Sequence, residues 1–186
     1  ESTVNVMGGG MVVDIKHLCG EIEKLTAAGI KITRDNLKLS DRAIICMPYH
    51  VQLDGLEEER LGDEKFGSTK RGIAPVYADK YMKKGIRMGD LLEPATLKDK
   101  LSDILAWKDI TLSGYGQKRL SVELMYQWIW EFGKGLLSYI TDTTAYLNKA
   151  VQENKKVLFE AQLGALRDID YGIYPYTTSS QTLAAY

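Results

Sequence analysis

The chain has 186 residues, 24 of them Lys or Arg and 25 Asp or Glu, and its formal net charge is −1. This length suits one domain with a single core, and the near-neutral charge excludes a general attraction to nucleic acid or to an anionic membrane surface. Apolar runs such as Ala43 to Met47 are far shorter than the roughly 20 residues that cross a bilayer, so we expect a soluble, cytoplasmic protein.

The first elements expected are two short extended segments, from Val4 to Met7 and from Met11 to Val13, joined by a turn at Gly8 to Gly10. Asp14 has the short acceptor side chain that favours a helix N-cap, and Gly29 can supply the left-handed residue that ends a helix. Between them, apolar side chains repeat at helical spacing, at Ile15, Leu18, Ile22 and Leu25. A helix is therefore predicted between Asp14 and Gly29.

Three further segments are predicted to be strands, namely Ile30 to Thr33, Ala43 to Met47 and Val157 to Phe159. The second is a continuous apolar run, which is typical of a strand buried on both faces of a parallel sheet. The charged stretch from Leu53 to Lys65 is interpreted as a short solvated helix. Because strands alternate with helices, the fold class is predicted to be α/β with a partly parallel sheet.

The region from about residue 95 to residue 152 is predicted to be mostly helical. One helix is expected from Ala95 to Trp107, and a long one from Ser121 to Gln152. Trp128 and Trp130 lie in the apolar stripe of the long helix, so we assign them to the core and not to a ligand-stacking site. The stripe consists of Val122, Met125, Ile129, Phe132, Leu136, Ile140 and Leu147.

The run GSTKRG, residues 67–72, is a candidate anion site. Gly67 and Gly72 permit a backbone that turns its N–H groups toward an anion, while the residues between them add hydroxyl groups and positive charge. The run is not a Walker A loop, because its lysine does not follow the second glycine. An ordinary turn is the alternative interpretation.

The run YPYTTSSQT places hydroxyl groups at Thr177 to Ser180, which can bind phosphate or can simply form caps and solvated turns. Upstream of it, Asp168 and Asp170 could form a pair of carboxylates for acid–base chemistry or a metal. With Arg167 adjacent and no histidine nearby, a structural ion pair or a turn is the favoured interpretation.

Neither histidine nor cysteine chemistry is indicated. His17 and His50 lack a Ser or Cys in a recognisable triad context. Cys19 and Cys46 lie in apolar stretches without the paired spacing of a zinc site or a disulfide framework, so they are predicted to be small buried hydrophobic residues.

Four blocks, in this order, resemble the adenylosuccinate synthetase family: GGGMVVD, SDRAIICMPYHVQLD, FGSTKRGIAPVYADKYMKKGIRMGDLL and VLFEAQLGALRDIDYGIYPYTTSSQT. Together they extend over nearly the whole chain, and the helical region is the least distinctive part. The resemblance implies the P-loop-NTPase-like fold of that family. The family's GDEGKG, GHT and NKxD-type motifs do not occur, and the chain starts at Glu1 without a methionine, so we expect residues 1–186 to be a single fragment of the family domain.

The resemblance also implies a reaction. GTP phosphorylates the 6-oxygen of inosinate (IMP), and L-aspartate then displaces the phosphate to give adenylosuccinate. The family's catalytic base lies in GDEGKG and its histidine in GHT, so this chain is expected to contain no catalytic residue and to be inactive alone. Magnesium would coordinate the nucleotide phosphates through ligands outside this chain.

Residue by residue, the resemblance assigns only IMP binding to this chain. Thr69 and Thr178 match the family's phosphate-binding threonines. Lys83 stands where the family has an arginine that reaches the partner subunit's IMP in a homodimer, and a point charge there replaces a bidentate fork. Gln162 is the expected contact to the base, although an ungapped alignment would place Leu163 there.

Two other functions remain open at this point. One is a phage-type relative that joins aspartate to a deoxyguanylate, which the base-contacting and sugar-contacting segments would distinguish. The other is a non-catalytic nucleotide-binding or dimerisation module that retains this segment and acts on a partner.

Overall fold

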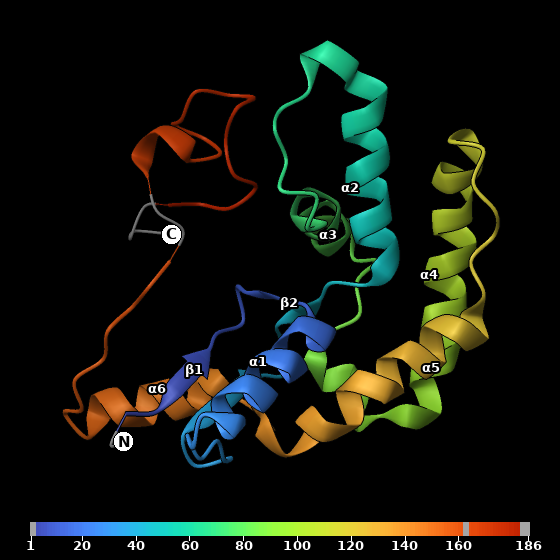
Figure 1. The fold of residues 1–186 in the computed structure, drawn as a ribbon. Helices are drawn as coiled ribbons and strands as arrows, with labels where there is room; N and C mark the ends of the chain where they lie inside the picture. The colour runs from blue at the N-terminus through green and yellow to red at the C-terminus, as the bar shows by residue number, and fades with distance from the viewer. Residues whose placement is uncertain (1–2, 162–163, 183–186) are drawn as a thin grey trace.

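The computed structural model describes residues 3–161 and 164–182, and Figure 1 shows its fold. Its strands are β1 Asn5–Met7, β2 Val12–Val13, β3 Leu37–Ser40, β4 Ile44–Ile45 and β5 Ile140–Thr141. Its α-helices are α1 Ile15–Ala27, α2 Pro48–Leu61, α3 Ile73–Met82, α4 Pro94–Gly114, α5 Val122–Gly133 and α6 Thr143–Gln152. Short 3₁₀ helices complete the list: η1 Gly62–Glu64, η2 Met88–Leu92, η3 Lys134–Tyr139 and η4 Ala165–Arg167.

The strands form two small sheets, one with the order β1-β3-β5 and one that pairs β2 with β4. The paired strands are parallel: Asn5 lies opposite Leu37, and Val12 lies opposite Ile44. Parallel strands need crossover connections, and α1 lies in the connection from β1 to β3 and in the connection from β2 to β4. The predicted α/β class and partly parallel sheet are confirmed.

Helix α1 follows its local signals closely. The Asp14 side chain accepts a hydrogen bond from the His17 N–H at 3.0 Å, which makes it the N-cap. Beyond the last turn, Gly29 has a φ of 85°, the left-handed conformation expected of a residue that follows a helix. The predicted helix between these residues is therefore confirmed.

The strand predicted from Ile30 to Thr33 is wrong, because this segment has no regular secondary structure and leads into a turn at residues 34–36 that precedes β3. The Thr33 N–H donates to the Asn36 side-chain oxygen at 2.8 Å, and the Asn36 N–H donates back to the Thr33 carbonyl at 3.1 Å. An asparagine side chain thus satisfies a backbone group that a strand would pair with its neighbour. The strand begins only after this turn, at Leu37.

The single long helix predicted from Ser121 to Gln152 is also wrong, because the region is divided into α5, η3, β5 and α6. Helix α5 ends at Gly133, where an added Cβ would lie 2.8 Å from the Leu91 side chain. Ile140 then pairs with Leu39 of β3, and Asp142 caps α6 by accepting from the N–H groups of its first turn. Strand pairing with a distant part of the chain has overridden the helical periodicity.

Two other predictions need correction. Val157 to Phe159 is not a strand, and the side chains of Leu158 and Phe159 are 94% and 80% exposed, since this segment pairs with no strand among the described residues. Helix α2 starts at Pro48 and is only partly solvated, because five of its residues are buried: Tyr49, His50, Leu53, Asp54 and Glu58. Helix α3, for which no helix was predicted, follows it.

The core lies between the sheets and helices α1, α4 and α5. Trp128 and Trp130 pack against it, as predicted. Cys46 is buried and Cys19 is half-buried; both are free, and the Cys19 thiol donates to the Phe132 carbonyl. None of the helices in the described part of the chain combines the length and the apolar character that crossing a membrane requires.

The segment 164–182 stands apart from this core in Figure 1, where it is coloured red and follows an extended stretch after α6. It lies beside the loop that joins α2 to α3. The rings of Phe66 in that loop and Tyr176 in the segment meet edge to face, with their centroids 6.4 Å apart. The fold therefore brings the GSTKRG run and the hydroxyl-rich run onto the same side of the molecule.

Candidate functional site

The GSTKRG run is held against α2 by that helix's own carboxylates. The Gly67 N–H donates to Glu58 at 3.2 Å, and the Gly72 N–H donates to Asp54 at 2.8 Å. These two N–H groups do face anions, as the glycines suggested, but the anions belong to the protein. Buried acceptors on α2 therefore satisfy the Gly67 and Gly72 N–H groups, and the binding of an external anion by the other groups of the run stays a prediction.

The carboxylate of Asp54 makes a second contact to the same run. Its other oxygen accepts from the Ser68 hydroxyl at 2.7 Å, and the Ser68 oxygen in turn accepts from the Lys70 N–H at 3.1 Å. The backbone approaches α2 closely at Gly72, which has a φ of 77° and where a Cβ would lie 2.8 Å from backbone atoms of His50 and Val51. A residue with a side chain could not occupy this position without a backbone shift.

The groups that remain for an external ligand are the hydroxyl of Thr69 and the cations of Lys70 and Arg71. All three residues are exposed. Their side chains have no hydrogen-bond or ion-pair partner in the part of the chain that the structure describes. The run is thus held at Ser68 and Gly72, and the arc between them, from Thr69 to Arg71, presents one hydroxyl and two positive charges outward.

Lys83 is the C-cap of α3, where it adopts a left-handed φ of 61°. It is exposed, and its ammonium group forms no ion pair within residues 3–161 and 164–182. Helix α3 has 10 residues, and with a rise of about 1.5 Å per residue it places Lys83 about 15 Å from the GSTKRG run. The structure therefore does not bring Lys83 together with Thr69 within one chain.

The end of α3 is positively charged. Lys80, Lys83, Lys84 and Arg87 gather there, where the partial negative charge of a helix C-terminus favours cations. Burial, and next the charge of Arg87, lower the pKa of Lys80. Mutual repulsion in this cluster would be relieved by an anion, which makes the end of α3 a second surface suited to phosphate.

In the C-terminal segment, Asp168 is fully buried. One of its oxygens accepts from the N–H groups of Asp170 and Tyr171, and the other accepts from the N–H and the hydroxyl of Thr182. These hydrogen bonds, first that of the Thr182 N–H, lower the pKa of Asp168. The structural interpretation of Asp168 and Asp170 is confirmed as a turn, with no pairing of the two carboxylates for acid–base chemistry.

Thr178 is half-buried in this segment. Its N–H donates to the Arg167 carbonyl at 2.8 Å, and its hydroxyl lies 3.3 Å from the Ser180 hydroxyl. The side chain is thus oriented by the segment itself while staying partly accessible. Gln162, expected to contact the base, and Leu163, its alternative, lie outside the described residues.

Tyr77, near the middle of α3, links the segments. Its hydroxyl donates to the carbonyl of Gly10, in the N-terminal glycine turn, at 3.2 Å. Burial is the first cause that raises the pKa of Tyr77, and the nearby Ser180 side chain acts in the opposite direction. The glycine turn, α3 and the hydroxyl-rich run therefore meet at one side chain, and these are parts of three of the four blocks in the sequence.

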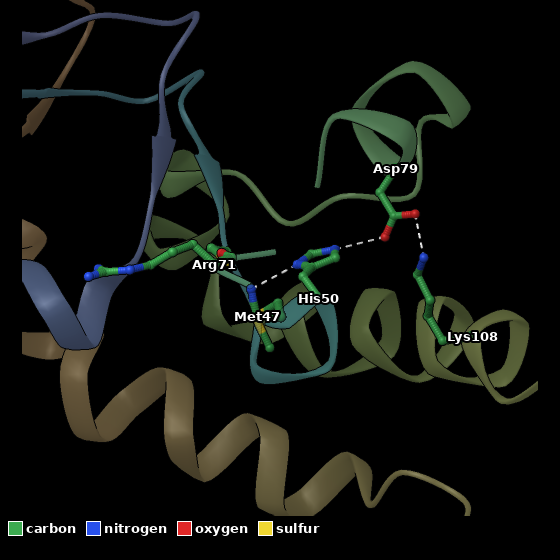
Figure 2. Close-up of polar contacts among 6 residues, drawn as sticks. Met47, His50, Arg71, Asp79 and Lys108 are labelled. Carbon is green, nitrogen blue, oxygen red and sulfur yellow. Dashed lines mark hydrogen bonds and ion pairs between the residues drawn. The ribbon is translucent and has the colours of Figure 1, made fainter. Parts of the chain in front are cut away.

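A buried polar row that the sequence did not reveal lies behind the GSTKRG run (Figure 2). The Met47 N–H donates to Nδ1 of His50 at 2.9 Å, and Nε2 of His50 lies 2.9 Å from Asp79. Since Nδ1 accepts, the proton of the neutral ring is on Nε2 and points to Asp79. The other oxygen of Asp79 accepts from the ammonium group of Lys108.

The row connects α2, α3 and α4, and none of its three side chains is more than 5% exposed. Burial is the first cause that lowers the pKa of His50, so the neutral ring is favoured. Arg71 points away from the row in Figure 2. His50 thus joins α2 to α3 through Asp79. The two residues are 29 positions apart in the sequence, which explains why no local pattern revealed the contact.

The described residues include no group of three or more His, Cys, Asp or Glu side chains arranged to hold a metal ion. The exposed hydroxyl and cations of the GSTKRG run are groups that can bind an anion such as a phosphate.

The comparisons with known proteins agree on one family. The family model described as adenylosuccinate synthetase matches residues 1–186. The adenylosuccinate synthetase of Caldanaerobacter subterraneus is 43% identical over 180 residues, which cover 96% of this chain and 42% of that protein. The protein of the same name from Clostridium novyi is 40% identical over 184 residues, or 99% of this chain and 43% of that protein.

A solved structure gives the same result. The fully ligated adenylosuccinate synthetase from Plasmodium falciparum superposes with a TM-score of 0.85 at 33% identity, covering 98% of this chain and 42% of that one. The fold implied by the sequence resemblance is thereby confirmed. The chain spans less than half the length of these relatives, 42% of the first.

Proposed function

Because the chain belongs to the adenylosuccinate synthetase family, we propose that residues 1–186 are one contiguous portion of an enzyme that joins L-aspartate to IMP, with GTP hydrolysis, to give adenylosuccinate. The observation that carries this proposal is the match over nearly the whole chain in both sequence and fold. The relatives reported above carry one name, and neither the deoxyguanylate-joining relative nor the non-catalytic module finds support in them.

In this enzyme the chain supplies part of the IMP site. We assign Thr69 and Thr178 to the phosphate, and Gln162 to the base. The exposed Thr69 hydroxyl, next to the positive charges of Lys70 and Arg71, supports this assignment. The contact between the Phe66 and Tyr176 rings supports it too, because it places the two threonine-bearing segments beside each other. Hydroxyl donors and nearby cations form the charge-assisted hydrogen bonds that a phosphate dianion requires.

Lys83 is assigned to the IMP bound by the partner subunit of a homodimer. The length of α3 separates Lys83 from Thr69 within one chain, and its ammonium group is exposed and unpaired in the described structure. A cation in that position is available to a ligand on a neighbouring subunit. The site would then be complete only when two chains associate.

The chemistry is assigned to residues outside this chain. In the family the catalytic base and the histidine belong to the GDEGKG and GHT motifs, which the sequence lacks. GTP and magnesium are assigned to the same missing parts, where bound magnesium would neutralise the nucleotide phosphates. The role left to this chain is to bind and orient IMP, so that its 6-oxygen meets the GTP bound elsewhere.

A cytoplasmic location is part of the proposal. Both cysteines are free, and the Cys46 thiol is buried beside apolar side chains. Burial, and next the charges of Asp14 and Asp54, raise the pKa of Cys46 to about 12, so the inert thiol form is favoured. Unpaired thiols suit a reducing compartment.

The test is an assay of the full-length protein that contains this chain. With IMP, GTP, L-aspartate and magnesium it is expected to form adenylosuccinate, and replacement of IMP by deoxyguanylate should abolish product. Lack of product with IMP would contradict the proposal. The chain of 186 residues alone should give no product above background, and product from it would contradict the assignment of the chemistry to the missing motifs.

A further inference from the structure

We propose that Asp54 is a positioning residue for the IMP site: its carboxylate holds both ends of the arc from Thr69 to Arg71 and thereby presents the Thr69 hydroxyl to the phosphate. This inference rests on the proposed function of Thr69. Asp54 itself is only 5% exposed and lies behind the arc, so it is assigned no contact with the substrate.

The geometry of the two hydrogen bonds carries the argument. One oxygen of Asp54 accepts from Ser68, the residue directly before the arc, at 2.7 Å. The other oxygen accepts from the N–H of Gly72, the residue directly after it, at 2.8 Å. One rigid group on α2 therefore fixes the two points between which the arc is suspended.

The C-terminal anchor of the arc is also fixed by packing. Gly72 caps α3 and touches the backbone of α2 at His50 and Val51, where no Cβ would fit. At the other anchor, the Ser68 oxygen accepts from the Lys70 N–H, so the hydroxyl relays the hold of Asp54 into the arc. The backbone of Thr69 has little freedom between these anchors, which lowers the entropy lost when it binds a ligand.

A carboxylate beside a phosphate site repels the phosphate. The direction in which the Kd for IMP changes on neutralising Asp54 therefore distinguishes a positioning role from a purely electrostatic one. If Asp54 acted on IMP only through its charge, neutralising it would remove a repulsion and tighten phosphate binding. If Asp54 acts by positioning, the same change weakens binding, because Ser68 and Gly72 donate to different carboxylate oxygens and an amide keeps only one of them. The two roles predict opposite shifts in the Kd for IMP.

The experiment compares Asp54→Asn with Glu59→Gln in the full-length protein, with the Kd for IMP measured by titration calorimetry. Glu59 is an exposed carboxylate on the same helix, with no hydrogen-bond or ion-pair partner among the described residues, so its variant makes the same charge change without removing a hydrogen bond to the arc. Asp54→Asn is expected to raise the Kd about tenfold, and Glu59→Gln to leave it within about twofold. An unchanged or lower Kd for Asp54→Asn would overturn the proposal.

A second readout separates positioning from general destabilisation. Asp54→Asn should raise the KM for IMP while kcat and the KM for GTP stay unchanged, whereas partial unfolding would lower kcat for all substrates. If Asp54→Asn does not fold, Ser68→Ala replaces it. That variant keeps the carboxylate, removes one anchor and should raise the Kd for IMP roughly fivefold. An unchanged Kd for a folded Ser68→Ala would reject the proposal.

The Thr69→Val background completes the test. If Asp54 acts through Thr69, Asp54→Asn should change the Kd by less than about twofold once the hydroxyl is absent. An equal loss in both backgrounds would overturn the positioning role. If Thr69→Val alone leaves IMP binding unchanged, the proposed function of Thr69 has failed; if it weakens binding and Asp54→Asn does not, the positioning role alone has failed.

Discussion

Two buried aspartates organise the two threonine-bearing segments of this chain in different ways. Asp54 belongs to α2 and holds the GSTKRG run from outside, through Ser68 and Gly72. Asp168 belongs to the segment that it organises, and it accepts hydrogen bonds from within residues 170–182. One loop is therefore fastened to the helices of the core, and the other is folded on itself.

The close glycine contacts follow the same division. A Cβ at Gly72 would clash with the backbone of α2, whereas a Cβ at Gly172 would lie 2.4 Å from the carbonyl oxygens of Leu166 and Asp168 in its own segment. The self-contained segment also exposes many apolar side chains, among them Leu166, Ile173 and Tyr176. The geometry of Thr69 thus depends on the packing of α2 and α3, and that of Thr178 depends on a small unit joined to the core by few contacts.

The largest effect is expected from Asp79→Ala, a change in the region where α2, α3 and α4 pack together. Loss of the Asp79 carboxylate would leave the Lys108 ammonium buried without its counter-ion and the Nε2 proton of His50 without an acceptor. Breaking a buried ion pair in this way costs about 3–5 kcal/mol of unfolding free energy. Urea unfolding of the full-length protein measures it. Asp103→Ala, an exposed position on α4, is the control and should change stability by less than about 0.5 kcal/mol.

The second largest effect is expected from Lys83→Ala, at the C-terminal end of α3. We expect it to weaken IMP binding by about 1.5 to 3 kcal/mol, the range for hydrogen bonds to charged groups, and to leave stability unchanged. It should also weaken IMP-promoted dimerisation by linkage. Calorimetry with IMP and analytical ultracentrifugation measure the two effects.

Mixed dimers decide on which subunit Lys83 acts. When Lys83→Ala is mixed with Thr178→Val, a lysine that serves the partner places both lesions in one site and leaves the other site intact. Activity should then recover above that of either variant alone. A lysine that serves its own subunit would leave one lesion in each site, and heterodimers without recovery would reject the shared site.

Thr178→Val tests the self-contained segment. It removes one hydroxyl from the phosphate and should weaken IMP binding by about 1 to 3 kcal/mol. Because the segment contributes little to the core, the unfolding midpoint should not move. Unchanged IMP affinity together with an unchanged midpoint would show that this threonine is not the phosphate ligand.

The predictability of the fold followed the range of the interactions. Helix α1 could be predicted because its determinants, Asp14, the apolar spacing and Gly29, are all local. The break in the predicted long helix could not be predicted. It depends on the pairing of Ile140 with Leu39, and the spacing of apolar residues contains no information about that pairing. A sequence pattern describes what a segment favours in isolation, and tertiary pairing decides between close alternatives.

The site shows the same limit. Thr69 and Thr178 were assigned to a ligand because a resemblance preserves order and spacing, and that assignment stays a prediction. The hydrogen bonds from Ser68 and Gly72 to Asp54 could not be predicted. These residues lie 14 and 18 positions from Asp54, and the bonds exist only once α2 and α3 have packed. His50 and Asp79 were missed for the same reason.

The smallest effect is expected where the two regions are joined. Tyr77→Phe keeps the ring but removes the hydroxyl, which donates to the Gly10 carbonyl and lies near the Ser180 side chain. Since Tyr77 is half-buried and water can replace the lost contacts, the loss of free energy should be about 0.5 to 1.5 kcal/mol. If the segment is joined to the core through this contact, the loss appears as faster amide hydrogen exchange in residues 164–182, with exchange in α2 and α4 unchanged. Tyr146→Phe is the control: the Tyr146 hydroxyl lies on α6 and has no hydrogen-bond partner among the described residues, so both exchange rates should stay unaltered. Faster exchange that spreads into α2 would instead show that the two regions open as one cooperative unit, and the division between a fastened loop and a self-contained one would then have to be given up.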